Sequence, residues 1–354
     1  MKREIDHKWK LLFNSYICHM IAHNVDLKPF NTFGISVKAD LFSRFSNTDE
    51  LRQLLKEFKG RELLILGGGS NILFTKDFPG VALRNEIKGF EVVQENEDFV
   101  LVRAGAGEVW HEFVMKCIEH GFAGLENLSL IPGSVGASPM QNIGAYGVEI
   151  KDVFHSLEAL HIETGEIHTF NKEACEFGYR ESVFKRKLKG QYVIVSVSFQ
   201  LSKHPNPNTS YGAIESELQK MGVTDPTIRD VSNAVIAIRT SKLPDPKLIG
   251  NAGSFFKNPV VDQSIVDKIL ENYPDAPNYP AEPGKRKLAA GWLIEQAGWK
   301  GRTIDHHGVH KLQALVLVNY GGATGQEVYA LSSAIIADIQ EKFGVTLERE
   351  VNIM

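Results

Sequence analysis

Two glycine-rich segments of the sequence have the composition of phosphate-binding loops, and the first is Gly67-Gly68-Gly69-Ser70-Asn71. It follows an apolar run, Leu63 to Leu66, so a strand should lead directly into a glycine turn. Glycines let a backbone approach a ligand closely and present bare amides to phosphate oxygens, and Ser70 and Asn71 add short donors. A tight turn without a ligand explains this segment equally well. Neither the Rossmann glycine pattern nor a P-loop is present.

The second segment, Ile131 to Gly147, contains four glycines and two prolines and has few side chains that could pack. It is also too apolar for a well-solvated surface loop. A large flat ligand would fill the space that the missing side chains leave. Two phosphate-compatible loops, well separated in the sequence, predict one extended dinucleotide that is held at both ends.

The segments that must position these loops alternate between helical and strand-like patterns. Asp225-Pro226 has the residue types of an N-cap and a first-turn proline, and helical spacing follows to about Thr240. Two prolines in Lys242-Leu-Pro-Asp-Pro246 predict a hinge or domain boundary. Thr346 to Ile353 has the pattern of a closing strand. This mixture predicts an α+β fold. Helices are also expected at 51–58, 110–120, 261–270, 288–297 and 324–343, a proline-rich loop at 273–283, and strands at 63–66, 81–83, 99–102, 153–162, 192–201 and 315–318.

The composition of the chain excludes several classes of partner. Of 354 residues, 43% are hydrophobic and 23% charged, and the formal net charge is −4. Such a chain can build two or three globular domains but has no basic field for nucleic acid or an anionic membrane. No apolar run approaches the about 18 residues that a spanning helix needs. We therefore expect no nucleic-acid partner and no membrane insertion.

The cysteines and the N-terminus indicate a cytoplasmic protein. Cys18, Cys117 and Cys175 are odd in number and form no C-x-x-C pair, so free thiols are expected rather than a disulfide framework or a zinc site. The charged and then apolar residues 1–22 lack a signal-peptide cleavage pattern. We interpret them as an N-terminal extension, with Met20 as a possible true start.

The two loops and several further motifs resemble one family, the UDP-N-acetylenolpyruvoylglucosamine reductases in their longer type I form. The most specific motif is Gly250-Asn-Ala-Gly-Ser-Phe-Phe-Lys-Asn-Pro259, which is too long and unusual to be a common chance match. The resemblance covers roughly residues 24 to 354. The other matching segments are Asn31–Gly34, Gly67–Leu73, Ile131–Gly147, Gly178–Arg180, Arg239–Pro244, Ala289–Ile294, Gln313–Val318 and Leu347–Val351.

The resemblance implies an α+β architecture: an FAD-binding PCMH-type fold of two subdomains, plus a smaller α+β substrate-binding domain that closes over the substrate. The implied FAD-binding subdomains are residues 23–88, completed by 345–354, and residues 89–242. The substrate-binding domain would be residues 243–344. A cytoplasmic, monomeric enzyme of peptidoglycan precursor synthesis is implied as well.

The implied activity is reduction of the enolpyruvyl ether of UDP-N-acetylglucosamine enolpyruvate to UDP-N-acetylmuramate. FAD, bound without a covalent bond, would pass on a hydride that NADPH supplies. NADPH and the UDP-sugar would take turns in one pocket, which fits the missing Rossmann motif. The residues implied to bind FAD are Gly67, Gly68, Gly69, Ser70, Asn71, Ile131, Gly133, Ser134, Gly136, Ala137, Ile143 and Gly144. Those implied to bind the substrate are Tyr211, Arg239, Lys242, Asn258 and Gln313.

Three catalytic residues follow from the resemblance. Hydride arrival at the terminal CH₂ pushes negative charge onto the substrate carboxylate, and the neighbouring carbon then needs a proton. Arg180 and Glu350 would stabilise this charge, and Ser254 would donate the proton. Arg180 is a fixed cation suited to a carboxylate, whereas Glu350 helps only when it is protonated, which desolvation would favour. Glu348 lies on the same face of the expected strand, and only the family motif selects Glu350.

One segment departs from the family pattern. Asp305-His306-His307-Gly308, followed by His310, could suggest a metal site, but no carboxylate lies at helical spacing, so we expect a solvated loop and no metal.

Two other functions remain open. A flavin oxidase of the same fold would need no Gly250 to Pro259 motif and would turn over in air without NADPH. A non-catalytic UDP-sugar binding protein would need no FAD loops and would be colourless.

Overall fold

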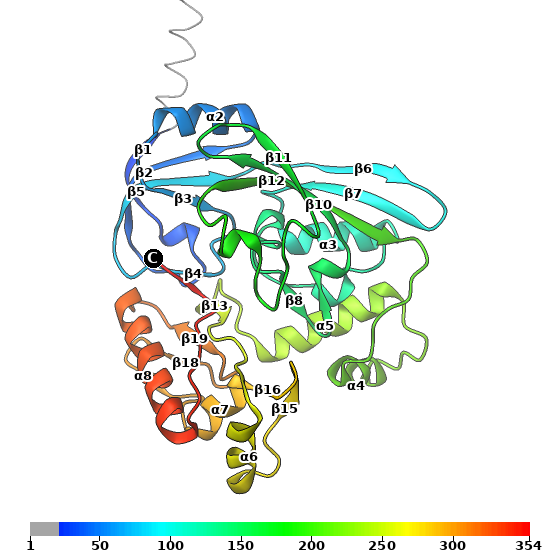
Figure 1. Ribbon diagram of the computed structural model, residues 1–354, viewed down its shortest axis with the longest axis vertical. Coiled ribbons are helices and arrows are strands. Elements are labelled where there is room, and N and C mark those ends of the chain that lie inside the picture. The colour runs from blue at the N-terminus through cyan, green and yellow to red at the C-terminus, as the bar shows by residue number, and fades with distance from the viewer. Residues whose placement is uncertain (1–20) are drawn as a thin grey trace, which may run out of the picture.

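The computed structural model describes residues 21–354, so Cys18, Met20 and most of the expected N-terminal extension lie outside the described residues. Ala22, which the sequence assigns to that extension, already begins strand β1 (Ala22–Asp26). Strand β1 lies at one edge of the first sheet, whose order is β1-β2-β5-β3 (Figure 1). The other strands of this sheet are β2 (Lys38–Phe45), β5 (Phe78–Asn85) and β3 (Leu63–Leu66).

Helix α2 (Thr48–Glu57) covers the first sheet because its sequence specifies both its start and its buried face. The Asn47 side chain accepts hydrogen bonds from the Asp49 and Glu50 amides, which caps the first turn. Leu51, Leu54 and Leu55 then fall on one side of the helix at the spacing of a buried stripe. They join a core cluster with residues of β5 and of the second sheet, so α2 helps to hold the two sheets together.

The second sheet is antiparallel throughout and has the order β11-β10-β12-β7-β6. The sequence predicts three of its strands, and a hairpin with Thr164-Gly165 at its turn joins β10 to β11. The helices α3 and α5 flank it, and α4 packs on α5 (Figure 1). The strands are β6 (Phe90–Glu95), β7 (Phe99–Gly105), β10 (Phe154–His161), β11 (Ile167–Asn171) and β12 (Tyr192–Ser202), and the helices are α3 (Trp110–Glu119), α4 (Gly212–Lys220) and α5 (Ile228–Lys242).

The third part of the chain contains a four-stranded sheet of order β13-β19-β18-β17 and a three-stranded sheet of order β14-β16-β15. Helix α8 (Gly325–Phe343) begins with a Thr324–Glu327 capping box and ends at Gly344, whose φ of 67° is the left-handed conformation that glycine permits. The remaining elements here are β13 (Gly250–Ser254), β14 (Val260–Asp262), α6 (Gln263–Asn272), β15 (Asn278–Pro280), β16 (Lys285–Leu288), α7 (Ala290–Gln296), β17 (Thr303–Ile304), β18 (His307–Val309) and β19 (Val316–Asn319).

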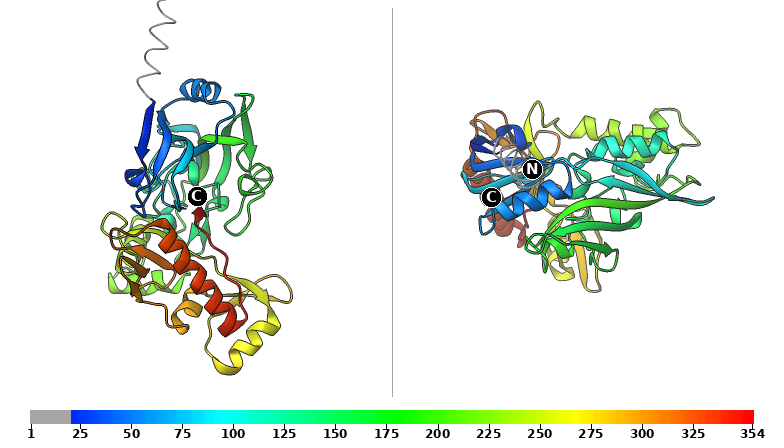
Figure 2. Two further views of the ribbon diagram at one scale, coloured as in Figure 1. Left: turned by 90° about the vertical axis from the view of Figure 1, so that its left-hand side faces the viewer. Right: turned by 90° about the horizontal axis from the view of Figure 1, so that it is seen from above.

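The C-terminal segment returns to the first part of the molecule. Strand β20 (Asn352–Ile353) pairs in parallel with β4 (Ile72–Leu73), directly after the first glycine loop. The left view of Figure 2 shows this segment rising from the lower half of the molecule into the upper half. Between residues 345 and 351 the segment forms only a single bridge, Phe256 with Arg349. The prediction of a continuous strand from Thr346 was therefore wrong, because before β20 this segment pairs only around that bridge, where the Lys257 amide donates to the Glu348 carbonyl and the Glu350 amide to the Phe255 carbonyl.

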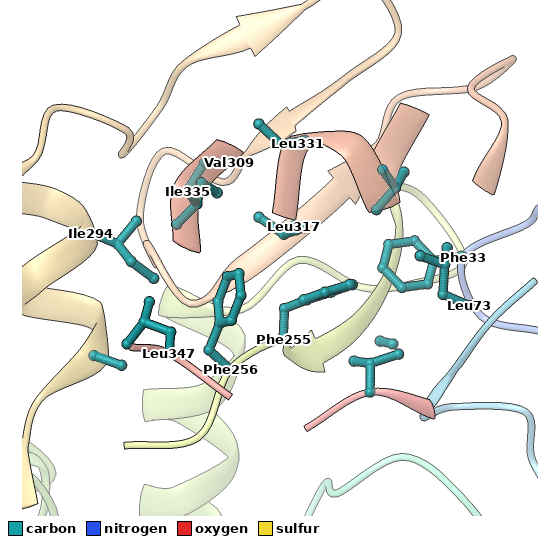
Figure 3. Close-up of a cluster of buried hydrophobic side chains, with 14 of the residues drawn as sticks. Phe33, Leu73, Phe255, Phe256, Ile294, Val309, Leu317, Leu331, Ile335 and Leu347 are labelled. Atoms are coloured by element: carbon teal, nitrogen blue, oxygen red, sulfur yellow. The ribbon is translucent and has the colours of Figure 1, made fainter. Parts of the chain in front are cut away.

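One hydrophobic core runs through both the first and the third part of the chain. It joins Phe33 and Leu73 to Phe255, Leu317 and Ile335 (Figure 3). The Asn319 side chain adds a hydrogen bond to the Phe33 carbonyl at 2.9 Å. A large apolar contact thus joins the first and third parts of the chain, although residues 242–246 were expected to form a hinge or domain boundary. The proposed division into three domains remains a prediction.

Three local predictions differ from the structure. Helix α5 is capped by Thr227 in a capping box with Asp230, so Asp225 is not the N-cap and Pro226 lies before the helix. The segments predicted to be helical from 261 and 288 start in short strands, β14 and the end of β16, and become helical two residues later. The proline-rich loop at 273–283 contains β15. Within residues 21–354, no helix is long and apolar enough to cross a membrane.

Candidate active site

An open cavity lies where the three parts of the chain and the C-terminal segment meet. Its volume is about 1270 Å³, its mouth included. Both glycine-rich loops contribute to its wall, together with the end of β13 and the segment before β20. Among the residues predicted from the sequence, those that line it are Gly67, Gly68, Gly69, Ser70, Asn71, Ile131, Gly133, Ser134, Ala137, Ile143, Gly144, Arg180, Arg239, Ser254 and Glu350.

The first glycine loop connects β3 to β4 and presents its backbone to the cavity. The N–H groups of Gly67 to Asn71 donate to no acceptor among the described residues. Unpaired amides in succession form a concave site for an anion, since buried backbone donors are otherwise almost always satisfied. At Gly69, φ is +61° and an added Cβ would overlap the Phe30 carbonyl, so only glycine fits. These features fit the phosphates of a dinucleotide such as FAD.

The two glycine loops lie side by side, which corrects the prediction that they hold opposite ends of a ligand. A Cβ on Gly68 would come within 2.8 Å of the Gly133 Cα, and the Ser70 hydroxyl donates to the Pro132 carbonyl at 3.1 Å. Several of the glycines are therefore needed for backbone-to-backbone packing. Gly136 belongs to this group and does not line the cavity, because its missing side chain leaves room for Ala106.

Arg180 and Glu350 form an ion pair within the cavity wall. Arg180 Nε lies 3.2 Å from Glu350 Oε1, and the two side chains are only 19% and 12% exposed. A second hydrogen bond, from Arg180 Nη2 to the Gly144 carbonyl at 2.7 Å, ties the guanidinium to the second glycine loop. Arg180 has a φ of 55°, so its side chain leaves the loop from a left-handed backbone conformation.

Burial raises the pKa of the Glu350 carboxyl, although Arg180 and two nearby lysines oppose this effect. A larger share of this carboxyl therefore stays protonated near neutrality than in an exposed glutamate. Glu348 differs because its side chain is 70% exposed and pairs with Lys257 at 2.5 Å. The two glutamates that the sequence could not separate thus occupy different environments, and only Glu350 lines the cavity.

Ser254 ends strand β13 and faces the cavity with an unpaired hydroxyl. Its Oγ makes no hydrogen bond to any described residue, in contrast to the fully buried Phe255 that follows it. The register of β13 against β19 shifts between Asn251 and Ser254, and Gly253 has a φ of 69°. This irregularity turns Ser254 out of the sheet, because a bulge re-aims the side chains around it.

Arg239 is a partly buried cation without a carboxylate partner among the described residues. It projects from α5, donates to the Leu130 carbonyl at 3.3 Å and hydrogen-bonds the Tyr146 hydroxyl. Burial lowers the pKa of its guanidinium, although the contact with Tyr146 opposes this effect. An anion in the cavity would supply the missing charge.

The other four residues predicted to bind the substrate do not line the cavity. Tyr211 is half-exposed and packs edge-on against Tyr146, and Lys242 is exposed at the end of α5. Asn258 accepts a hydrogen bond from the Ala290 amide at 3.0 Å, and Gln313 lies beside the same helix, α7. These residues could contact a ligand only beyond the lining of the cavity.

The histidine segment is not the solvated loop that the sequence predicts. His307 lies in strand β18 and, like His310, is only 6% exposed, whereas His306 is exposed. The prediction was wrong because β18 is an inner strand of its sheet. The mostly polar residues of this segment give no sign of a buried strand. No group of His, Cys, Asp and Glu within residues 21–354 could hold a metal ion. Cys117 and Cys175 are free and buried.

Two residues of the site escaped the sequence analysis: Gln141, which lines the cavity, and Tyr146, which contacts the cavity residue Arg239. Gln141 lines the cavity and contacts both Asn71 and Glu350. Tyr146 has a φ of 50° and holds Arg239. Their only signal in the sequence is that each is a polar side chain in a loop of small residues.

Comparisons with known proteins agree with this arrangement. Residues 245–354 match the family model described as UDP-N-acetylenolpyruvoylglucosamine reductase, C-terminal domain, and residues 39–171 match an FAD binding domain. The chain is 52% identical over 335 residues to UDP-N-acetylenolpyruvoylglucosamine reductase of Flavobacterium johnsoniae, which covers 94% of this chain and 99% of the relative. It is 53% identical over 331 residues to that of Pseudomonas syringae pv. tomato, which covers 93% and 97%. The crystal structure of UDP-N-acetylenolpyruvylglucosamine reductase from Thermus caldophilus has the same fold, with a TM-score of 0.66, 22% identity and coverage of 93% of this chain and 97% of that one.

Proposed function

Because this chain belongs to the UDP-N-acetylenolpyruvoylglucosamine reductase family and is an FAD-dependent oxidoreductase, we propose that it reduces UDP-N-acetylglucosamine enolpyruvate to UDP-N-acetylmuramate with electrons from NADPH. One observation carries the proposal. Arg180, Ser254 and Glu350 come from three separate segments and line the same cavity as the unpaired amides of the first glycine loop. A site with bound dinucleotide, carboxylate-binding groups and a free hydroxyl matches the needs of this reaction.

FAD, when bound, supplies the hydride for the substrate after its own reduction by NADPH. The chain's part is to hold the phosphates on the amides of Gly67 to Asn71 and to leave room beside Ala137, Ile143 and Gly144. NADPH and the UDP-sugar would use one pocket in turn. The sequence supports this shared pocket, since it contains no separate motif for binding a nicotinamide dinucleotide.

The reacting part of the substrate would lie between Arg180, Glu350 and Ser254. Arg180 binds the carboxylate on which charge accumulates, and Glu350 in its protonated form donates a hydrogen bond to it. Ser254 Oγ donates its proton to the carbon that bears this carboxylate. A serine hydroxyl is a weak acid, but a carbanion is a far stronger base than water.

The diphosphate and uridine would extend away from this point. Arg239 supplies a partly buried positive charge in the cavity wall. Tyr211, Lys242, Asn258 and Gln313 would contact the substrate outside the present lining of the cavity. We further propose that the enzyme is monomeric and works in the cytoplasm.

Separate measurement of the two half-reactions tests this function. Acid precipitation should release FAD, NADPH should reduce the flavin anaerobically, and the UDP-enolpyruvyl sugar should reoxidise it. Glu350→Gln should slow only the reoxidation, while the matched change at the exposed neighbour, Glu348→Gln, should leave both steps near the wild-type rates. Rapid reoxidation by air with no response to the sugar would instead indicate an oxidase. Colourless protein would indicate a binding protein.

A further inference from the structure

Gln141 makes a contact with Glu350 for which the proposed function gives no reason. Its side chain lines the cavity from the second glycine loop. Gln141 Oε1 accepts a hydrogen bond from Asn71 Nδ2 at 2.7 Å, and Gln141 Nε2 donates to Glu350 Oε1 at 3.3 Å. Gln141 therefore connects both glycine loops to the Glu350 carboxyl in the cavity wall.

The orientation of this amide follows from its neighbours. Asn71 Nδ2 also lies 3.3 Å from the backbone carbonyl of Glu350, which can only accept a hydrogen bond. The nitrogen of Asn71 must face that carbonyl, so its N–H groups point toward Gln141 as well. Gln141 must then present its oxygen to Asn71 and its nitrogen to Glu350.

Two donors consequently meet the same oxygen of Glu350. Arg180 Nε lies 3.2 Å from Oε1, and Gln141 Nε2 approaches that same atom. None of the described residues makes a hydrogen bond to Oε2. A hydroxyl hydrogen on Oε1 would face two N–H groups, which repel it. When the carboxyl is protonated, its hydrogen must therefore be on Oε2.

We propose that Gln141 is a positioning residue that, together with Arg180, keeps the proton of Glu350 on Oε2, where it can be donated to the substrate carboxylate. This inference rests on the proposed function, because it assigns the neutral form of Glu350 to that step. Without the amide, the carboxyl could rotate and offer an unprotonated oxygen to the substrate. Gln141 itself need not contact the substrate or transfer a proton.

The charged groups around Glu350 determine how its protonation responds to pH. Arg180, Lys185 and Lys257 favour the ionised carboxylate, and Tyr179 lies close enough to interact with it. Gln141 carries no charge, but its N–H group also favours the ionised form. Its removal should raise the pKa of the Glu350 carboxyl. If protonated Glu350 is needed, the alkaline decline of the reoxidation rate should then move to higher pH.

The experiment is stopped-flow reoxidation of the prereduced holoenzyme by the UDP-enolpyruvyl sugar, from neutral to alkaline pH. Gln141→Met keeps the length of the side chain but removes both polar groups. We expect about tenfold slower reoxidation, the effect of one hydrogen bond, and an alkaline decline at higher pH. Reduction by NADPH and FAD retention should not change. In Gln141→Glu a second carboxyl shares the proton, so the decline should move further. The exposed Gln219→Met should match wild type.

Each outcome separates this inference from the function on which it rests. Gln141→Met with a wild-type rate and an unshifted pH profile would overturn the positioning role. So would equal slowing of both half-reactions without a shift of the profile, because that is the signature of loop packing alone. If Glu350→Gln itself reoxidised normally and kept the alkaline decline, the catalytic assignment of Glu350 would fail instead.

Discussion

Arg180 pairs an unfavourable backbone conformation with a functional position. A φ of 55° is unusual for a residue with a long side chain, and the two contacts of the guanidinium, to Glu350 and to the Gly144 carbonyl, hold it there. Strain of this kind persists only where the surrounding structure enforces it. Here it directs a cation to the Glu350 carboxyl in the cavity wall.

Two truncations of Arg180 should therefore differ in stability but not in activity. Arg180→Ala and Arg180→Gly both remove the cation, so both should slow reoxidation of the flavin by the sugar. Arg180→Gly should be the more stable of the two by about 1 kcal/mol, since glycine adopts positive φ without the Cβ penalty. Thermal unfolding of the two holoproteins measures the difference. Equal stability would mean that the backbone relaxes when the side chain is lost.

Ser254 should act at a single step. Its hydroxyl makes no hydrogen bond to the described residues, so Ser254→Ala should disturb packing little and leave FAD binding and reduction by NADPH unchanged. Loss of a positioned acid costs roughly 10²–10⁴-fold in rate, and we expect a loss at the upper end in reoxidation by the sugar. Ser254→Cys should recover part of it. The exposed Ser216→Ala serves as the control, and a rate for Ser254→Ala within about tenfold of wild type would show that another group donates the proton.

At the scale of secondary-structure elements, helix α5 links local sequence to the site. It carries Arg239 into the cavity wall, and its first turn is fixed by the reciprocal hydrogen bonds of Thr227 and Asp230. The sequence predicts the start of this helix at Asp225-Pro226, because these residue types are typical of a helix start. The capping box two residues later satisfies two backbone donors instead of one, which explains why it is the real start.

The start of α5 gives a direct test. Thr227→Ala should destabilise the protein by about 1 kcal/mol, because it leaves a first-turn amide without its acceptor. Asp225→Ala is the matched control and should leave the stability close to that of wild type, since Asp225 is exposed and caps nothing. Chemical denaturation of both holoproteins measures this. The reverse order of effects would restore Asp225 as the cap.

Elements with local signals were predicted well, and tertiary relations were not. The strand Leu63–Leu66 and the helix between Thr324 and Gly344 were predicted correctly because an apolar run, a capping residue and a terminal glycine lie within the segments themselves. The contact of Gly68 with Gly133 depends on the packing of the two loops, which no local pattern encodes. The burial of His307 likewise depends on the strands around it.

At the scale of the whole molecule, the first and third parts of the chain behave as one packed unit. Gly325, the first residue of α8, lies so close to Phe74 that an added Cβ would overlap the Phe74 carbonyl. Gly250 is in the same position toward the Phe33 carbonyl. With the continuous core between them, these approaches indicate that the two parts are held together by close packing.

Substitution at this contact tests the rigidity. Gly325→Ala should cost about 1–3 kcal/mol of stability, since a backbone carbonyl cannot move aside as a side chain can. It should also weaken FAD retention, because the cavity wall includes residues from both parts. Gly212→Ala is the matched control at the first position of α4, where an added Cβ meets nothing within 4 Å. A Gly325→Ala protein with the melting temperature of wild type would show that the two parts separate easily.

The pairing of β20 with β4 has a consequence for folding during synthesis on the ribosome. The Asn71 amide and the Glu350 carbonyl that it contacts are separated by 279 residues. At typical elongation rates, the segment with Glu350 emerges roughly 15 to 55 s after the first glycine loop has been made. Throughout that interval β4 has no partner, and the wall of the cavity that Glu350 completes does not yet exist. The growing polypeptide can gather the phosphate-binding loops early, but the wall of the cavity is complete only after the segment with Glu350 has left the ribosome.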